Sequence, residues 1–151
     1  MALFATLYGI ETVSLRYFNL YGLRQKSEGA YASVVAKFIA YRNAGSPLPI
    51  VGDGAQTRDF VHVSDVVRAN IAAMESGQVG KGETINIGGG LGLSVLEIAK
   101  LVGGKTEYIS PRVEIRDSVA SIKHAEELLG WSPRVAVTEG IEELLKNSLQ
   151  K

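Results

Sequence analysis

The sequence contains no cysteine, which excludes disulfides and thiolate metal sites and fits a reducing cytosol. It also lacks a net charge, because sixteen basic residues balance sixteen acidic ones, so no overall field attracts nucleic acid or an anionic membrane. Its apolar runs are too short to span a bilayer, and the apolar start at residues 1–8 has neither the basic residues nor the cleavage site of a signal peptide. We therefore expect a cytoplasmic protein without a nucleic-acid or membrane partner.

Residues with common catalytic or metal-binding chemistry are also few. Neither His62 nor His124 has further ligands at metal-binding spacing, so no zinc or iron site is expected. The tyrosines could supply a catalytic phenol, but none has a lysine four residues later that would lower its pKa. No catalytic residue is therefore predicted.

With 151 residues, 46% of them hydrophobic, the chain can bury a core as one domain or as a large piece of a bigger one. Residues 1–8 favour a helix but lack an amino-terminal cap, so the chain is expected to begin inside an element. Apolar spacing predicts further helices at 30–43, 64–76, 95–102, 121–129 and 138–149, and strands at 12–17, 48–51, 59–63, 83–87 and 106–109. Helices and strands alternate, which indicates an α/β fold.

Two polar residues lie where open α/β folds bind ligands. Arg58 stands where a glycine turn meets a strand, and its guanidinium suits a diphosphate, although a surface pair with Asp59 is an equally simple interpretation. Asn19 follows the strand at 12–17 and offers both a donor and an acceptor at its carboxyl end, although asparagine is also a common turn residue. Residue pattern alone leaves both alternatives open.

The glycine cluster at 88–92 invites comparison with dinucleotide-binding loops, where glycines let backbone amides approach a phosphate. The required spacing fails, since a G-x-G-x-x-G register from Gly88 meets Leu93 and one from Gly90 meets Val95. A turn between a strand and a helix is the better interpretation.

Several motifs together resemble a known family. These are SLRYFNLYGLRQ, GAYASVVAKFI, PLPIVGDGAQTRDFVHVSDVVRA, TINIGGG, SVLEIA and AEELLGWSPRVAVTEGI, which cover nearly the whole chain in order. They are similar to the extended short-chain dehydrogenases/reductases, and most of all to the NAD-dependent epimerase/dehydratase group. Such enzymes have an amino-terminal Rossmann domain that holds NAD and a smaller carboxyl-terminal domain that covers a sugar nucleotide.

The resemblance implies a role for twelve residues. It places Tyr17 and Phe18 beside the nicotinamide, and Asn19 at the substrate diphosphate or sugar. Arg58 and Arg112 would bind the diphosphate. Residues that would hold or pack against the nucleobase, or line the same cleft, are Ala32, Ser33, Val34, Val35, Ile50, Val51 and Asn86.

The sequence departs from the family pattern in two places. The usual R-P-G-[DE]-V-R is one residue shorter here, as Arg112-Val113-Glu114-Ile115-Arg116, which puts Arg112 off register, and Ser121 replaces the aspartate expected before the next helix. More importantly, the G-x-x-G-x-x-G turn for NAD and the catalytic Y-x-x-x-K pair are absent. We therefore expect a carboxyl-terminal fragment, with 1–22 a remnant of the Rossmann domain and 23–151 mainly the substrate domain.

The resemblance favours a UDP-hexose 4-epimerase as the parent enzyme, with a 4,6-dehydratase or a decarboxylase as alternatives. The chain itself is expected to bind no NAD and to catalyse nothing, and it could also serve alone as a nucleotide-sugar-binding or interaction module. Separation from a Rossmann domain would expose the strand at 12–17 and the helix before it, so a homodimer or higher oligomer through residues 1–20 is expected.

Overall fold

The computed structural model describes residues 2–29 and 32–148, in which helices and strands alternate along the chain. The helices are α1 (Ala2–Tyr8), α2 (Val34–Asn43), α3 (Val63–Glu75), α4 (Val95–Val102), α5 (Lys123–Leu129) and α6 (Val137–Ser148). The strands are β1 (Thr12–Tyr17), β2 (Asn19–Tyr21), β3 (Leu48–Val51), β4 (Thr57–His62), β5 (Lys81–Ile87), β6 (Gly92–Ser94), β7 (Thr106–Ile109) and β8 (Asp117–Ser118). The expected α/β class is confirmed. Within the described residues, no helix has the length and apolarity needed to cross a membrane.

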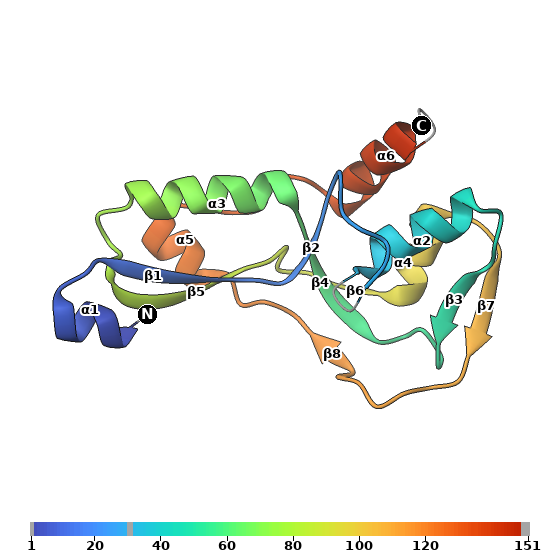
Figure 1. Ribbon diagram of the computed structural model, residues 1–151, viewed down its shortest axis with the longest axis horizontal. Coiled ribbons are helices and arrows are strands. Elements are labelled where there is room, and N and C mark those ends of the chain that lie inside the picture. Colours follow the sequence, from blue (N-terminus) through green and yellow to red (C-terminus); the bar gives the residue numbers. More distant parts are fainter. Residues whose placement is uncertain (1, 30–31, 149–151) are drawn as a thin grey trace.

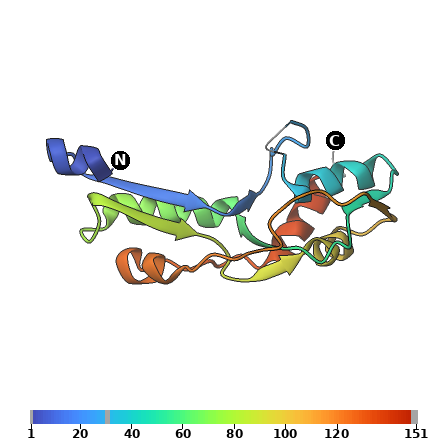
Figure 2. The same cartoon turned by 90° about the horizontal axis from the view of Figure 1, so that it is seen from below.

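The elements form two groups at opposite ends of an elongated molecule (Figure 1). We call α1, β1, α3, β5 and α5 the sheet lobe, and α2, β3, α4, β7 and α6 the helix lobe; Figure 2 shows the same separation from below. Each lobe has its own hydrophobic cluster. Strand β4 runs between them and contributes Phe60 to one cluster and the adjacent Val61 to the other, because successive side chains of a strand face opposite ways.

The sheet lobe is built on a parallel pair of strands, in which Tyr17 of β1 lies opposite Ile87 of β5. Ile85 and Ile87 are fully buried against Ala69 of α3 and Ala125 of α5, which explains the apolar character of these segments. Among the described strands, β1 pairs with β5 alone. The apolar side chains of α1 are more than half exposed, namely Leu3, Phe4, Leu7 and Tyr8.

The helix lobe packs α2, α4 and α6 around a second core that includes the fully buried Phe38, Ile98 and Ile141. Beside it, β3 pairs in parallel with β7. Helix α4 begins as expected, since Ser94 and Glu97 form a reciprocal capping box. In the middle of the molecule β4 pairs with β2, β6 and β8.

Several expected boundaries are wrong. The helix expected at 30–43 begins at Val34, because the Ser33 hydroxyl accepts the Ala36 N–H and caps it there; residues 30 and 31 lie outside the described part of the chain. The helix expected at 64–76 begins at Val63, and although Ser64 and Asp65 are residue types that commonly cap helices, its cap is His62, whose Nδ1 lies 3.4 Å from the Ser64 nitrogen.

The last two helices also differ in detail from the expectation. Helix α5 starts two residues later than expected, and no side chain caps it, so Ser121 does not act as its cap. Helix α6 starts at Val137, one residue earlier than expected, and residue 149 is outside the described residues.

Candidate functional site

Seven of the residues singled out from the sequence surround one hollow of about 480 Å³. They come from five separate parts of the chain and are Asn19, Ala32, Ser33, Val34, Val51, Arg58 and Arg112. We call this hollow the polar cleft. Because its floor is formed where β2 and β4 meet the amino-terminal end of α2, it lies on the helix-lobe side of the central strands.

The Arg58 side chain is held in a fixed orientation at the cleft. Its Nη1 donates to the Thr57 carbonyl at 2.7 Å and to the Arg116 carbonyl at 3.3 Å, and its Nη2 donates to Oε2 of Glu114 at 3.1 Å. The side chain is only 18% exposed. The alternative in which Arg58 pairs with Asp59 is therefore wrong, because neighbouring side chains of β4 point to opposite faces.

Glu114 joins the two arginines of the cleft. Its Oε2 lies 3.5 Å from Nη2 of Arg112 as well as 3.1 Å from Nη2 of Arg58, and its Oε1 accepts an N–H from Gln56 at 3.1 Å. Two guanidinium groups and an amide thus meet at one carboxylate, which is a donor set suited to an anion with several oxygens. Sequence reasoning missed Gln56 and Glu114, since the bonds from Gln56 and from Arg58 to Glu114 join residues 58 and 56 positions apart in the chain.

An apolar wall faces these charges. Ala32, Val34, Pro49 and Val51 line the polar cleft, and the same residues, with Arg112, also line an adjoining hollow of about 530 Å³. The wall is anchored through Gln25, which accepts the Ser33 hydroxyl at 2.8 Å and donates to the Leu20 carbonyl at 2.9 Å. A flat ring could lie against such a surface while an attached anionic group reaches the arginines.

Val35 and Ile50 lie behind this wall. Both are fully buried in the helix-lobe core, where they support Val34 and Val51 from inside. Neither lines the cleft, so any effect on a ligand would act through the shape of the wall.

Asn19 is fixed by the strand next to it. Its Nδ2 donates to the Asp59 carbonyl at 2.8 Å, in register with the pairing of Asn19 and Phe60 between β2 and β4. The residue lines the cleft from this position. Asn19 is thus part of a strand and not a turn residue.

The remaining three candidates lie outside the polar cleft. Tyr17 is 45% exposed, and its hydroxyl donates to Oδ1 of Asn70 across the hollow between β1 and α3. The Phe18 nitrogen donates to the Ile87 carbonyl, and the Asn86 amide lies 3.4 Å from the Ser121 carbonyl. These residues lie at or next to the carboxyl ends of β1 and β5, in the sheet lobe.

The glycine cluster receives a carboxylate from its own chain. The buried Asp59 side chain accepts the N–H groups of Gly89 and Gly90. A Cβ atom on Gly88 would lie 2.8 Å from Oδ2 of Asp59, so a side chain there would block this contact. The interpretation of the cluster as a turn after a strand is supported, and the amides of Gly89 and Gly90 are already occupied.

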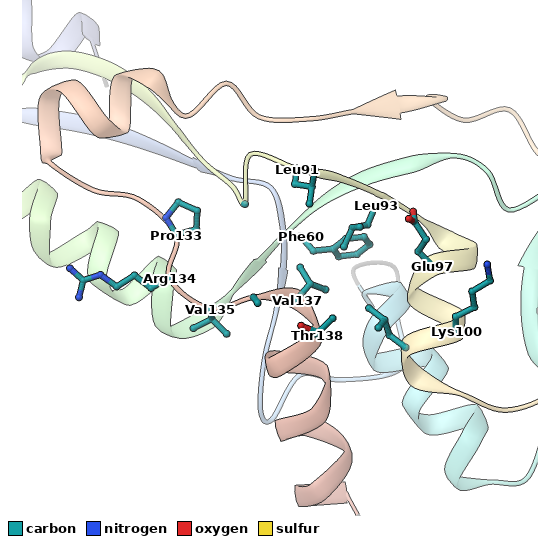
Figure 3. A pocket seen from close by; sticks show the side chains of 13 residues that line it. Phe60, Leu91, Leu93, Glu97, Lys100, Pro133, Arg134, Val135, Val137 and Thr138 are labelled. Atoms are coloured by element: carbon teal, nitrogen blue, oxygen red, sulfur yellow. The ribbon is translucent and has the colours of Figure 1, made fainter.

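A larger and more apolar groove, of about 650 Å³, lies between α4, the start of α6 and residues 133–136. Figure 3 shows Phe60 and Leu93 beside each other in its wall, with Glu97 and Lys100 of α4 at its rim. Its lining is mainly apolar and brings no two cationic groups to one point, so it offers less to a charged ligand than the polar cleft does.

Acid–base and metal chemistry have little support in the described residues. No three histidine, aspartate or glutamate side chains gather there as metal ligands. Tyr21 is fully buried, and this burial, together with the charges of Asp65 and Glu143, raises the pKa of its phenol well above the usual range. Its hydroxyl therefore stays protonated and cannot act as a base near neutral pH.

Comparison with known proteins gives consistent matches. The sequence profile of the NAD dependent epimerase/dehydratase family matches residues 2–88. A putative UDP-glucose 4-epimerase of Methanocaldococcus jannaschii is 40% identical over 95% of this chain and 47% of its own length. A UDP-N-acetyl-alpha-D-glucosaminuronate decarboxylase of Bacillus cytotoxicus is 35% identical over 93% of this chain and 47% of its own.

Among solved structures, UDP-glucose 4-epimerase from Thermotoga maritima with UDP-glucose superposes with a TM-score of 0.87 at 39% identity. The match covers 97% of this chain and 50% of that one. This chain therefore spans about half the length of the proteins that it resembles.

Proposed function

Because this chain belongs to the NAD dependent epimerase/dehydratase family, we propose that it is the carboxyl-terminal, nucleotide-sugar-binding half of such an enzyme. The observation that carries the proposal is the convergence of Asn19, Arg58 and Arg112 with an apolar wall in one cleft. In this arrangement the two arginines bind the diphosphate, the wall at Ala32, Val34 and Val51 holds the nucleobase, and Asn19 reaches the sugar end.

The ligand that fits this assignment best is a UDP-hexose, and the parent reaction is a 4-epimerisation. The Methanocaldococcus and Thermotoga relatives, both named as UDP-glucose 4-epimerases, support this choice. The decarboxylase among the relatives favours a second candidate, a parent that removes a carboxyl group from a UDP-uronic acid. Both reactions place the same nucleotide diphosphate in the cleft.

In the proposed division of labour this chain binds substrate and does not catalyse. NAD would supply hydride transfer in the parent enzyme, whereas a glycine turn for its pyrophosphate and a Tyr/Lys pair have no counterpart in this sequence. Residues 1–22 belong to the Rossmann part in this proposal and 23–151 mainly to the substrate domain. Tyr17 at the carboxyl end of β1 and Phe18 next to it would lie nearest the nicotinamide in the parent.

The isolated chain would associate with itself through residues 1–20. The proposal is supported by the pairing of β1 with β5 alone among the described strands and by the exposed apolar residues of α1. An exposed strand edge beside apolar side chains favours pairing with another chain.

A thermal-shift panel with UDP, dTDP, GDP and NAD tests the proposal directly. A ligand that binds the folded chain raises its melting temperature in proportion to its affinity and concentration. We expect a shift with UDP that exceeds those with dTDP and GDP, and none with NAD. A shift with NAD alone would contradict the assignment of this half to the sugar nucleotide.

A further inference from the structure

Asp59 is a fully buried carboxylate at the junction of the two lobes. It accepts backbone N–H groups from Gly89, from Gly90 at 2.9 Å and from Ala120 at 3.0 Å. Among the described residues it forms no ion pair with a lysine, arginine or histidine. Backbone amides are thus its hydrogen-bond donors in the structure, and such a buried charge is sensitive to the loss of any of them.

The three amides come from two of the segments in which the chain crosses between lobes. Residues 88–91 lead from β5 of the sheet lobe to β6 and α4, and residues 119–122 lead from β8 back to α5. Both crossings pass beside the central strands in Figure 1. The Asp59 side chain therefore ties both crossings to β4.

The backbone of the same residue reaches the polar cleft. Its carbonyl accepts the Nδ2 group of Asn19 at 2.8 Å, and the preceding residue on β4 is Arg58. A shift of β4 at Asp59 would move both cleft residues together. Side chain and backbone of Asp59 thus connect the lobe junction with the cleft.

The close approach of the first crossing is specific to glycine. A Cβ atom on Gly89 would lie 2.6 Å from the Phe60 carbonyl oxygen and 3.2 Å from Oδ1 of Asp59. Any side chain there would force the loop away from β4. The glycines and the carboxylate therefore act as one clamp, defined here as Asp59 with Gly88, Gly89, Gly90 and Ala120.

We propose that Asp59 is a positioning residue for the polar cleft: its side chain fixes β4 against the crossings at 88–91 and 119–122, so that Asn19, bonded to the Asp59 carbonyl, and Arg58 face one ligand. This inference rests on the proposed nucleotide-sugar binding. A carboxylate is needed because each of its oxygens only accepts hydrogen bonds, whereas an asparagine would turn an NH₂ group toward at least one of the three N–H donors. The residue acts without touching the ligand.

Asp59→Asn is the test variant, and Asp65→Asn is its matched control. Asp65 is also buried, at 1% exposure, and its carboxylate likewise accepts distant backbone N–H groups, from Arg134 at 3.1 Å and Val135 at 3.0 Å. It lies on α3, does not line the polar cleft and pairs with Arg68. Both changes are isosteric and replace an accepting oxygen by an NH₂ group that faces backbone N–H donors. Both should therefore lower the melting temperature, but only Asp59→Asn should alter the cleft.

Two readouts separate positioning from general loss of stability. In ligand-free samples at a temperature where both variants are folded, Asp59→Asn should shift the NMR signals of the Asn19 side-chain amide and the Arg58 Nε–H, while Asp65→Asn leaves them in place. UDP affinity should fall by about tenfold or more for Asp59→Asn, since displacements of about 1 Å suffice for losses of this order. Asp65→Asn should bind UDP as the wild type does.

Equal spectra and equal affinities in the two variants would overturn the proposal. If the wild type binds no UDP, the proposed function fails, whereas the ligand-free spectra still decide the role of Asp59. If Asp59→Asn does not fold, amide hydrogen exchange in the ligand-free wild type decides instead. The clamp amides should then exchange together with those of β2 and β4, and independent exchange as in a free loop would refute the inference.

Discussion

Replacement of Arg58 by alanine tests the charge assignment of the cleft. The guanidinium is 18% exposed and is oriented by two backbone carbonyls, so little side-chain entropy is lost when it binds a ligand. Loss of a charge-assisted, bidentate contact of this kind costs about 1.5–3 kcal/mol. We therefore expect UDP affinity to fall by about 10- to 150-fold. Glu114 would then face the diphosphate with the 70%-exposed Arg112 as its remaining ion-pair partner, which favours the upper end of that range.

Titration calorimetry at one fixed salt concentration measures this effect, and Arg116→Ala provides the control. Arg116 also pairs with a carboxylate, Asp53 at 2.9 Å, but its side chain is 60% exposed and does not line the polar cleft. An exposed pair contributes about 0–1 kcal/mol, so its loss should change UDP affinity by less than about twofold. Equal affinities of wild type and Arg58→Ala, or equal losses in the two variants, would refute the assigned role of Arg58.

Four further outcomes are expected. The pure chain, given NAD and UDP-glucose, should form no epimer over hours by NMR, and any conversion would contradict the assignment of catalysis to another part of the parent. Glu114→Gln should raise UDP affinity by about threefold, because it frees two guanidinium groups from an internal carboxylate, whereas a fall would mean that Glu114 itself contacts the ligand. Gly140→Ala should destabilise the fold by about 1–3 kcal/mol in denaturant titrations, since its Cβ would lie 2.3 Å from the Tyr21 hydroxyl. In a Tyr21→Phe background the same change should cost less stability, and an equal cost would exclude a clash with the hydroxyl as the cause. Light scattering at tens of micromolar should show a dimer or larger species, and a clean monomer would contradict the proposed interface.

Local signals explain which elements could be predicted. The strands at 12–17, 48–51 and 106–109 match their observed bounds. β-Branched and aromatic residues favour a strand locally, and the turn formers on either side mark its ends. The start of α4 was also evident, since Ser94 and Glu97 form the cap within four residues. The glycine cluster could be recognised as a turn from spacing alone.

What the sequence did not reveal depends on distant partners. Strands β2, β6 and β8 have only two or three residues, and each exists because it pairs with β4, as Asn19 does with Phe60 across 41 positions. Helix α3 takes its cap from His62, the last residue of β4, and begins at Val63, which the sequence pattern places inside the strand at 59–63.

The candidate site shows the same limit. The sequence identifies Arg58 as a candidate and offers the adjacent Asp59 as a possible partner. The structure instead pairs Arg58 with Glu114, 56 residues away. No sequence motif indicated a role for Asp59. Its contacts are with backbone amides of the segments 88–91 and 119–122, which only the folded chain brings to it. Residue type thus indicated what the cleft could bind, while the fold determined which side chains meet there.

Chemical-shift mapping of the ¹⁵N-labelled chain with UDP tests the central claim most directly, because it locates the bound nucleotide. The account predicts saturable shifts confined to residues that line the polar cleft, with the largest at Asn19, Ser33 and Arg58, and no change at the apolar groove around Leu91 and Pro133. Shifts centred on that groove, or no shifts at millimolar UDP, would contradict it.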